Sequence, residues 1–355
     1  MKRCIIYPWN REQKWMIEKC ENYCKYEIKS VIPFKNHSEK NGKVIRDDLF
    51  EIEKELKEVD ILWIVQTDDL LVFSDDILPK IELAVLLGKK VLYTRNVNKK
   101  EEKLLKNSVP REQLIFRENQ IEYININNTI SNIDTPIVMI AGMTKKINKV
   151  EYLIRLENAL HQQGYKVIVF SDNKEIMGYK YGYWLPTEIE GKCNQSWMMK
   201  AFNQYIKRIE LQKNPDIILV GIEAGTATFN NRYVEDFGVT AYSVARIARP
   251  DYLIFNILFG DYKKEDVYCL DNDIQKIIGE KIDFYNITNE TIDVIESENK
   301  NRVETMCVNG VFFQNKMDKE LQAKDIGKLK EEKDYMRLAN QIIDKLSGYA
   351  IVQGI

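Results

Sequence analysis

Apolar segments alternate with helix-patterned segments along almost the whole chain, and this alternation restricts the fold more than any other feature. Continuous apolar runs occur at residues 4–7, 60–66, 137–141, 166–170 and 216–220. Such runs are typical of strands that are covered on both faces, and their alternation with helices favours parallel sheets with crossover connections. The sequence therefore predicts an α/β fold.

The chain has 355 residues, which is too long for one ordinary hydrophobic core and suits two domains. A polar, Asn-rich tract at residues 125–135, followed by Pro136, marks the predicted boundary. We therefore predict one domain at residues 1–130, a second at 136–318, and a closing C-terminal helix within 319–355. The helix is expected from charged sequence with helical apolar spacing at residues 319–346.

The first domain has the order of a small Rossmann-like unit. Helices are expected at residues 12–24 and 77–87, the second of them ended by Gly88, and further strands at 26–33 and 90–94. The first strand is followed by Pro8, Trp9 and Asn10, so the glycines of a dinucleotide-binding turn are missing. We expect this domain to bind neither NAD nor FAD, and to serve in docking or scaffolding.

Composition narrows the class of protein further. The formal net charge is −2, which gives no general attraction to nucleic acid or to anionic lipid. No run reaches the roughly 18 to 20 apolar residues that cross a bilayer, and the apolar stretch at the N-terminus is too short for a signal peptide. We expect a cytoplasmic protein that binds neither membrane nor nucleic acid; the oligomeric state stays open.

The cysteines and histidines do not have metal-ligand spacing. Cys20 and Cys24 share one face of the predicted helix, but further ligands are lacking, and the only histidines are His37 and His161. We expect packed, unbridged thiols and no metal.

The second domain opens with a loop that resembles a P-loop. The strand at residues 137–141 is followed by Gly142, Thr144, Lys145, Lys146, Asn148 and Lys149, and then by an amphipathic helix that ends at Gly164. Backbone amides at such a helix start, together with a lysine, form a cradle for phosphate. The spacing is similar to the G-x5-G-K-T variant of dethiobiotin-synthetase-like proteins, which predicts a P-loop-NTPase-like parallel sheet.

Two positions depart from that pattern. Asn148 stands where glycine belongs, and we expect the loop to form because asparagine tolerates positive φ. Val150 stands where a Mg²⁺-binding hydroxyl belongs, which argues against ordinary Mg·ATP chemistry. Two interpretations remain: a strand–helix turn with exposed lysines, or retained binding of a nucleotide such as ATP or GTP, or of phosphate.

Other residues are candidates for the same site. Glu223 follows the strand at 216–220, at the edge of the sheet where open α/β proteins bind ligands, and it could position water or a metal; it could equally be a solvated loop carboxylate. Asp251 is better explained as a residue of strand entry, and Asn256 is a further candidate. The aromatic tract at 179–186 fits a self-packed loop, a stacking surface or a docking patch.

Residues 138–186 resemble a family of clostridial proteins encoded beside bacteriocin-like precursor peptides and their modifying enzymes. The resemblance includes the loop at 142–149, the Gly-Tyr-Lys-Val at 164–167, and the segment from Gly178-Tyr179 to Leu185-Pro186. Residues 6–8, 59–65 and 250–252 are also similar. Loops of this family carry Gly-Lys where this chain has Asn148-Lys149, so nucleotide turnover in relatives does not transfer directly.

The resemblance implies an accessory or scaffold protein in the maturation of a ribosomally made peptide, with a peptide-modifying enzyme or the precursor peptide as partner. One alternative is an ATP-dependent ligase or kinase-like enzyme, which the missing hydroxyl at Val150 disfavours. Another is a two-Rossmann glycosyltransferase-like enzyme, which rests on architecture alone. The sequence names no catalytic residue.

Overall fold

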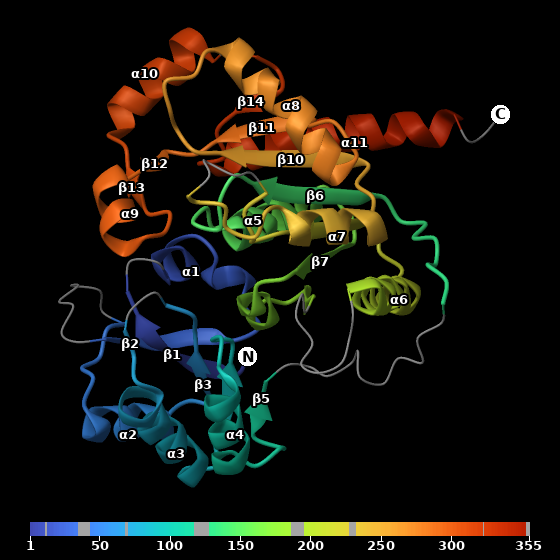
Figure 1. Cartoon of the computed structure of the whole chain (residues 1–355). Coiled ribbons are helices and arrows are strands. Elements are labelled where there is room, and N and C mark those ends of the chain that lie inside the picture. Colours follow the sequence, from blue (N-terminus) through green and yellow to red (C-terminus); the bar gives the residue numbers. More distant parts are fainter. Residues whose placement is uncertain are drawn as a thin grey trace. The chain divides into compact units, whose positions relative to one another are not determined.

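The computed structural model describes residues 1–10, 13–34, 43–67, 70–116, 128–185, 195–226, 232–321 and 323–352. The fold is α/β with predominantly parallel sheets, as predicted (Figure 1). The chain divides into two compact units. Unit 1 contains residues 1–119 with 174–184, and unit 2 contains residues 120–173 with 185–355.

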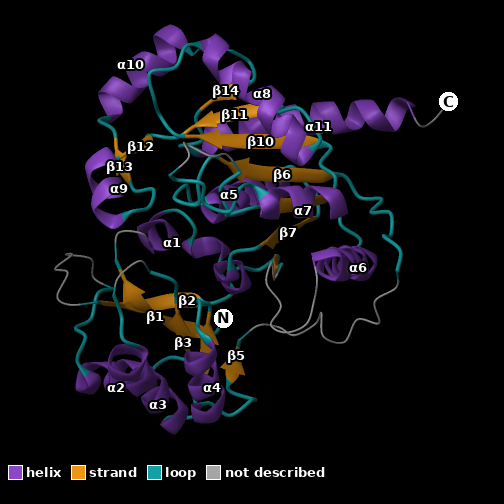
Figure 2. Cartoon of the chain, viewed as in Figure 1, coloured by secondary structure: helices purple, strands orange, loops and turns teal. Residues whose placement is uncertain are grey.

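Unit 1 is built on a five-stranded parallel sheet in the order β2-β1-β3-β4-β5. Figure 2 shows helices α2, α3 and α4 together below strands β1 and β3. Its strands are β1 (Arg3–Trp9), β2 (Glu27–Pro33), β3 (Ile61–Ile64), β4 (Lys90–Tyr93) and β5 (Leu114–Ile115), and its helices are α1 (Lys14–Glu18), α2 (Leu49–Lys57), α3 (Leu78–Leu86) and α4 (Lys99–Ser108). A short 3-10 helix spans Glu21–Tyr23, and a π-helical turn, Phe73–Ile77, leads into α3.

The core of unit 1 joins the sheet to α2, α3 and α4. Ile5, Leu62, Ile64 and Val91 of the strands pack with Ile81 of α3, all without exposed surface. The strands are apolar on both faces because helices or loops cover both, which is the arrangement expected for continuous apolar runs. Gly88 has a φ of 69° just after α3, so the glycine ends the helix as predicted.

The segment Lys174–Trp184 folds as part of unit 1. It contains a 3-10 helix (Lys174–Gly178) and the strand β8 (Gly182–Trp184). The Tyr179 ring is buried, stacks on Trp15 at 5.9 Å between ring centroids, and meets Trp63 edge-on at 6.2 Å. This tyrosine of the aromatic tract is therefore a packing residue, whereas Pro186 lies outside the described residues.

The larger sheet has seven strands in the order β14-β11-β10-β6-β9-β7-β8. Besides β8, the sheet contains β6 (Ile137–Gly142), β7 (Val167–Ser171), β9 (Ile217–Gly221), β10 (Tyr252–Ile257), β11 (Phe284–Ile287) and β14 (Ile326–Gly327). β6 lies between β9 and β10 and is parallel to both. The loops that follow β6, β7 and β9 therefore meet at one edge of this sheet, at the carboxyl ends of the strands.

The helices of unit 2 cover both faces of this sheet. Figure 1 shows α7 and α8 in front of β6 and β10, with α5 and α11 behind them. The helices are α5 (Lys149–Gln162), α6 (Gln195–Lys213), α7 (Val239–Ile247), α8 (Lys264–Ile278), α9 (Val294–Lys300), α10 (Gly310–Glu320) and α11 (Glu332–Val352). Arg155 of α5 lies 4.3 Å from the centre of the Tyr335 ring of α11, so these two helices pack directly.

Residues 289–308, which follow β11, form a small substructure that we call the β12–β13 module. It contains the antiparallel strands β12 (Glu290–Ile292) and β13 (Thr305–Cys307), with α9 between them. The amide of Val308 donates to the carbonyl of Asn289 and closes the module at its base.

Two helix predictions are wrong in extent. The predicted helix at 12–24 is α1 followed by the separate 3-10 helix, because Lys19 has a φ of −125° that interrupts the helix. Cys20 and Cys24 are therefore not on one helix, although both are buried and neither forms a disulfide. The predicted helix at 319–346 contains β14, which pairs with β11, so the closing helix starts only at Glu332.

The predicted division into residues 1–130, 136–318 and 319–355 stays a prediction. Part of the boundary tract, residues 125–127, lies outside the described residues, as do His37 and Cys193.

Candidate phosphate-binding site

The loop at 142–149 begins at the buried carboxyl end of β6. A side chain on Gly142 would place its Cβ 3.0 Å from Cε of Lys149 and 3.1 Å from the backbone oxygen of Asn256. The carbonyl of Gly142 accepts from the amide of Thr226. Glycine suits this position because the lysine side chain and the neighbouring strand approach the backbone so closely that a Cβ would push them aside.

Lys149 is the first residue of α5, and its side chain has no exposed surface. Its Nζ donates to the carbonyl oxygens of Thr144 at 2.8 Å, Ile147 at 3.1 Å and Glu223 at 2.9 Å. Burial lowers the pKa of the ammonium group, and the nearby charges of Glu223 and Asp172 oppose that shift. The lysine therefore links the loop to the residues after β9 by hydrogen bonds, and its side chain does not point into solvent.

Glu223 lies two residues beyond β9, the strand next to β6. Its carboxylate accepts from the amides of Lys149 and Val150, with Oε2 3.4 Å from the Lys149 nitrogen. Its other oxygen, Oε1, is buried and has no hydrogen-bond partner among the described residues. Burial raises the pKa of Glu223 to about 7, the charge of Asp172 adds to the shift, and Lys149 opposes it.

Asp172 follows β7 and completes this cluster. Its carboxylate accepts from the amides of Glu223, at 2.7 Å, and Ala224. Burial raises its pKa to about 6 in spite of the neighbouring Lys149. Two carboxyl groups with raised pKa values thus lie beside one buried ammonium group.

Glu235, from the segment before α7, binds the first turn of the loop. Its carboxylate accepts from the Thr144 hydroxyl at 2.6 Å and from the Lys145 amide at 3.0 Å. It also lies so close to Gly225 that a Cβ there would be 1.8 Å from Oε2. Glu235 has a φ of 43° and Phe237 a φ of 57°, so the segment that carries this carboxylate is strained.

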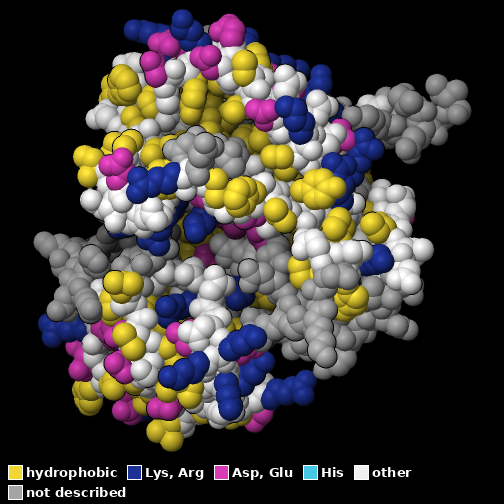
Figure 3. All heavy atoms as spheres, viewed as in Figure 1, with side chains coloured by type: hydrophobic (Ala, Val, Ile, Leu, Met, Phe, Trp, Pro, Cys, Tyr) yellow, Lys and Arg dark blue, Asp and Glu magenta, His cyan; other side chains and the backbone are white. Residues whose placement is uncertain are grey.

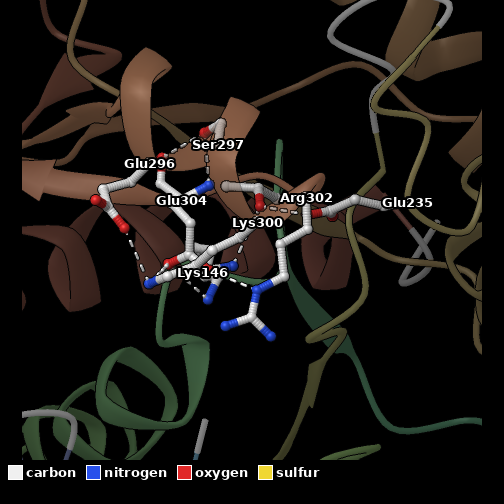
Figure 4. Close-up of polar contacts among 8 residues, drawn as sticks. Lys146, Glu235, Glu296, Ser297, Lys300, Arg302 and Glu304 are labelled. Atoms are coloured by element: carbon white, nitrogen blue, oxygen red, sulfur yellow. Dashed lines mark hydrogen bonds and ion pairs between the residues drawn. The ribbon is translucent and has the colours of Figure 1, made fainter.

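Lys146 connects the loop to the β12–β13 module. Its ammonium group lies 3.3 Å from Oε2 of Glu304, and both side chains are largely buried. Arg302 contacts the other oxygen of Glu304 at 2.5 Å, and Lys300 is 3.9 Å away. Figure 4 shows these cations around Glu304, with Glu235 nearby.

Asn148 does not have the backbone conformation that we expected. Its φ is −73°, and it is the N-cap of α5, since its side chain accepts from the amide of Glu151. The expectation of positive φ is wrong at this position: a capping side chain, which glycine lacks, explains the asparagine instead. Val150 is buried, so its methyl groups serve the core.

The structure brings the predicted site residues together in one cluster at the carboxyl edge of the sheet. Only the Lys145 side chain is exposed, and its amide is the part that faces the cluster. Asp172, Glu235, Arg302 and Glu304 were missed. Asp172 could have been found, because it closely follows a predicted strand at the same edge, whereas Glu235 and Glu304 lie far along the chain without a local motif.

The other candidates have structural roles. Asp251 accepts from the amide of Ile137 at the start of β6, which agrees with strand entry. Asn256 donates to the carbonyl of Ala141 and accepts from Asn286, and both asparagines are buried. A cavity of about 710 Å³ includes Asp251 in its lining, so it lies at the amino ends of the strands, away from the loop.

Within the described residues, no group of three or more His, Cys, Asp or Glu side chains is placed to hold a metal ion. None of the helices in the described part of the chain is both long and apolar enough to cross a membrane.

The fold and the loop together define a class: a two-unit α/β protein whose second unit contains a P-loop-type strand, loop and helix. No family model matches the sequence, and no curated protein matches it significantly. Among solved structures, the chain is similar to a DUF1611 family protein from Anabaena variabilis, with a TM-score of 0.54 and 14% identity. The match covers 84% of this chain and 91% of the other, so the likeness extends through both units and shows the fold alone.

A second solved structure is chloroplast FtsY from Physcomitrella patens. It aligns with 14% identity over 67% of this chain and 79% of its own, with a TM-score of 0.28. That score is too low to define a shared fold.

Proposed function

We propose that the loop at 142–149 binds the phosphate groups of a nucleoside triphosphate, ATP or GTP. The observation that carries this proposal is that the loop's donors are directed at negative oxygens. The amides of Lys145, Lys149 and Val150 and the hydroxyl of Thr144 all bond to carboxylates. A cradle that already holds two carboxylates has the donors and the helix start that phosphate oxygens require.

In this proposal Glu223 and Glu235 hold the loop in its unliganded form. A phosphate that enters must displace one carboxylate or both, because like charges at hydrogen-bonding distance repel strongly. Displacing Glu235 also lets Glu235 and Phe237 leave their positive-φ conformations. The released backbone strain offsets part of the free energy that the displacement costs. The binding free energy is then the difference between the hydrogen bonds that the loop makes to phosphate and those that it loses to the carboxylates. Because these two sets of bonds are similar, we expect a modest affinity.

Calorimetry with ATP, GTP and tripolyphosphate tests this proposal. Removing a cation in Lys146→Ala should weaken binding about tenfold, and removing a competing charge in Glu235→Gln should strengthen it by a similar factor. Lys213→Ala, an exposed lysine at the end of α6, is the matched control and should change nothing. The absence of heat with all three ligands, for wild type and Glu235→Gln alike, would end the proposal.

We also propose an accessory role in the maturation of a ribosomally made peptide. It is supported by the resemblance of residues 138–186 and by an apolar patch made of Val294, Ile295, Met306, Val311 and Phe312, all exposed. Figure 3 shows hydrophobic side chains gathered over α9 and α10. Exposed apolar groups of this kind are common at protein-docking sites.

Co-expression with the precursor peptide and its modifying enzyme tests this role. The wild-type chain should copurify with one of them, and the double variant Ile295→Glu/Phe312→Glu should not. Leu211→Glu, equally exposed on α6, should leave the complex intact. The role is refuted when neither partner is recovered although the enzyme is active.

A further inference from the structure

A cavity of about 320 Å³ lies between the β12–β13 module and the segment before α7. The module contributes most of its walls, and the segment before α7 contributes Arg232 and Tyr233. The remaining lining residues are Ile292, Val294, Ser297, Glu298 and Val303. The cavity thus combines an aromatic ring, a guanidinium group and aliphatic side chains.

The cavity adjoins the phosphate-binding loop through two short links. Ser297, in the cavity wall, accepts from the amide of Glu304 at 2.9 Å through its hydroxyl. The carboxylate of Glu304 in turn pairs with Lys146 of the loop at 3.3 Å. Figure 4 shows Ser297, Glu304 and Lys146 in this succession. A chain of polar contacts therefore connects the cavity wall to the loop.

The planar groups of the cavity are held in place. Nε and Nη2 of Arg232 donate to Oδ1 of Asn301 at 3.3 and 3.2 Å, and the guanidinium carbon lies 5.4 Å from the centre of the Tyr233 ring. Asn301 ends α9 with a φ of 51°, a left-handed conformation that asparagine tolerates, and its side-chain oxygen fixes Arg232. Flat rings stack readily on aromatic and guanidinium planes.

We propose that this cavity binds the nucleobase of the ligand whose phosphates lie in the loop. The inference rests on the proposed function and adds the second half of the ligand. Ile292 and Val303 supply apolar contacts to the ring, and the carboxylate of Glu298 accepts a hydrogen bond from an exocyclic amine. The cations Lys146, Lys300 and Arg302 lie near the path between cavity and loop, which suits a polyphosphate chain better than an apolar peptide.

Binding of ATP, GTP, CTP and UTP, compared with tripolyphosphate, tests the inference. In Tyr233→Ala, affinity for at least one nucleotide should fall roughly tenfold, since base stacking contributes about 1–3 kcal/mol, while affinity for tripolyphosphate stays unchanged. Tyr242→Ala is the matched control, because Tyr242 also lies beneath an arginine, Arg246 at 4.9 Å, but outside the cavity. Its affinities should equal those of wild type.

A second variant protects the test against a damaged fold. Val294 lines the cavity yet is 63% exposed, so Val294→Trp fills the space without touching the core. It should weaken nucleotide binding and spare tripolyphosphate. If nucleotides and tripolyphosphate both bind and neither variant separates them, the base lies elsewhere and the inference is overturned. If none of the ligands binds, the proposed function itself fails and the inference falls with it.

Discussion

At the scale of single residues, two carboxyl groups with raised pKa values, Glu223 and Asp172, lie at the phosphate-binding loop. Burial raises the pKa of Glu223 to about 7 and that of Asp172 to about 6. Because these values exceed the ordinary ones, the folded protein keeps protons that the unfolded chain has already released. The two groups therefore favour the folded state at low pH, and that contribution is lost as the pH rises toward 7.

The titration of Glu223 should appear in ligand affinity. Protonated Glu223 carries no charge, so it competes less with an anion for the amides of Lys149 and Val150. Affinity for tripolyphosphate should rise as the pH falls from about 8 to about 6, by a larger factor in wild type than in Glu223→Gln. Calorimetry at a series of pH values measures the difference between the two proteins, and protonation of the ligand affects both equally. Parallel curves would exclude Glu223 as the competing group.

At the scale of elements, the sequence predicted what depends on local pattern. The strands β6, β7 and β9 are almost wholly apolar, and their predicted positions were confirmed within one or two residues. The start of α5 was also predictable, because a turn, a lysine and an amphipathic helix follow one another directly.

The elements that were missed depend on distant pairing. β14 has only two residues, and nothing in its own sequence separates it from a helix; its parallel pairing with β11 makes it a strand. Glu235 was missed as a site residue for the same reason: its role depends on a contact with Lys145, which is 90 positions away in the chain. A left-handed backbone at that residue has no composition signal, since glutamate is an unusual choice for positive φ.

Asn148 shows how a correct motif can be explained wrongly. Its place in the loop was predicted, but its backbone is ordinary, and the side chain caps α5. A substitution that removes a P-loop glycine can therefore strengthen the helix start instead of straining the loop.

At the scale of the whole molecule, every residue assigned to the ligand belongs to unit 2. A ligand present at about 100 times its dissociation constant stabilises the state that binds it by about 2.7 kcal/mol. Hydrogen exchange with ATP should therefore slow the core amides of unit 2, in β6, β9 and β10, by roughly 100-fold. The core amides of β1 and β3 in unit 1 should exchange at their unliganded rates, because that unit gains no contact.

Lys146→Ala provides the control at the same ATP concentration, since it should reduce the protection of unit 2 in proportion to its lost affinity. Equal protection of both units would mean that they unfold together, so that the two compact units form one cooperative folding unit. Protection confined to unit 1 would place the ligand there, and the loop at 142–149 would then be only the turn that joins β6 to α5.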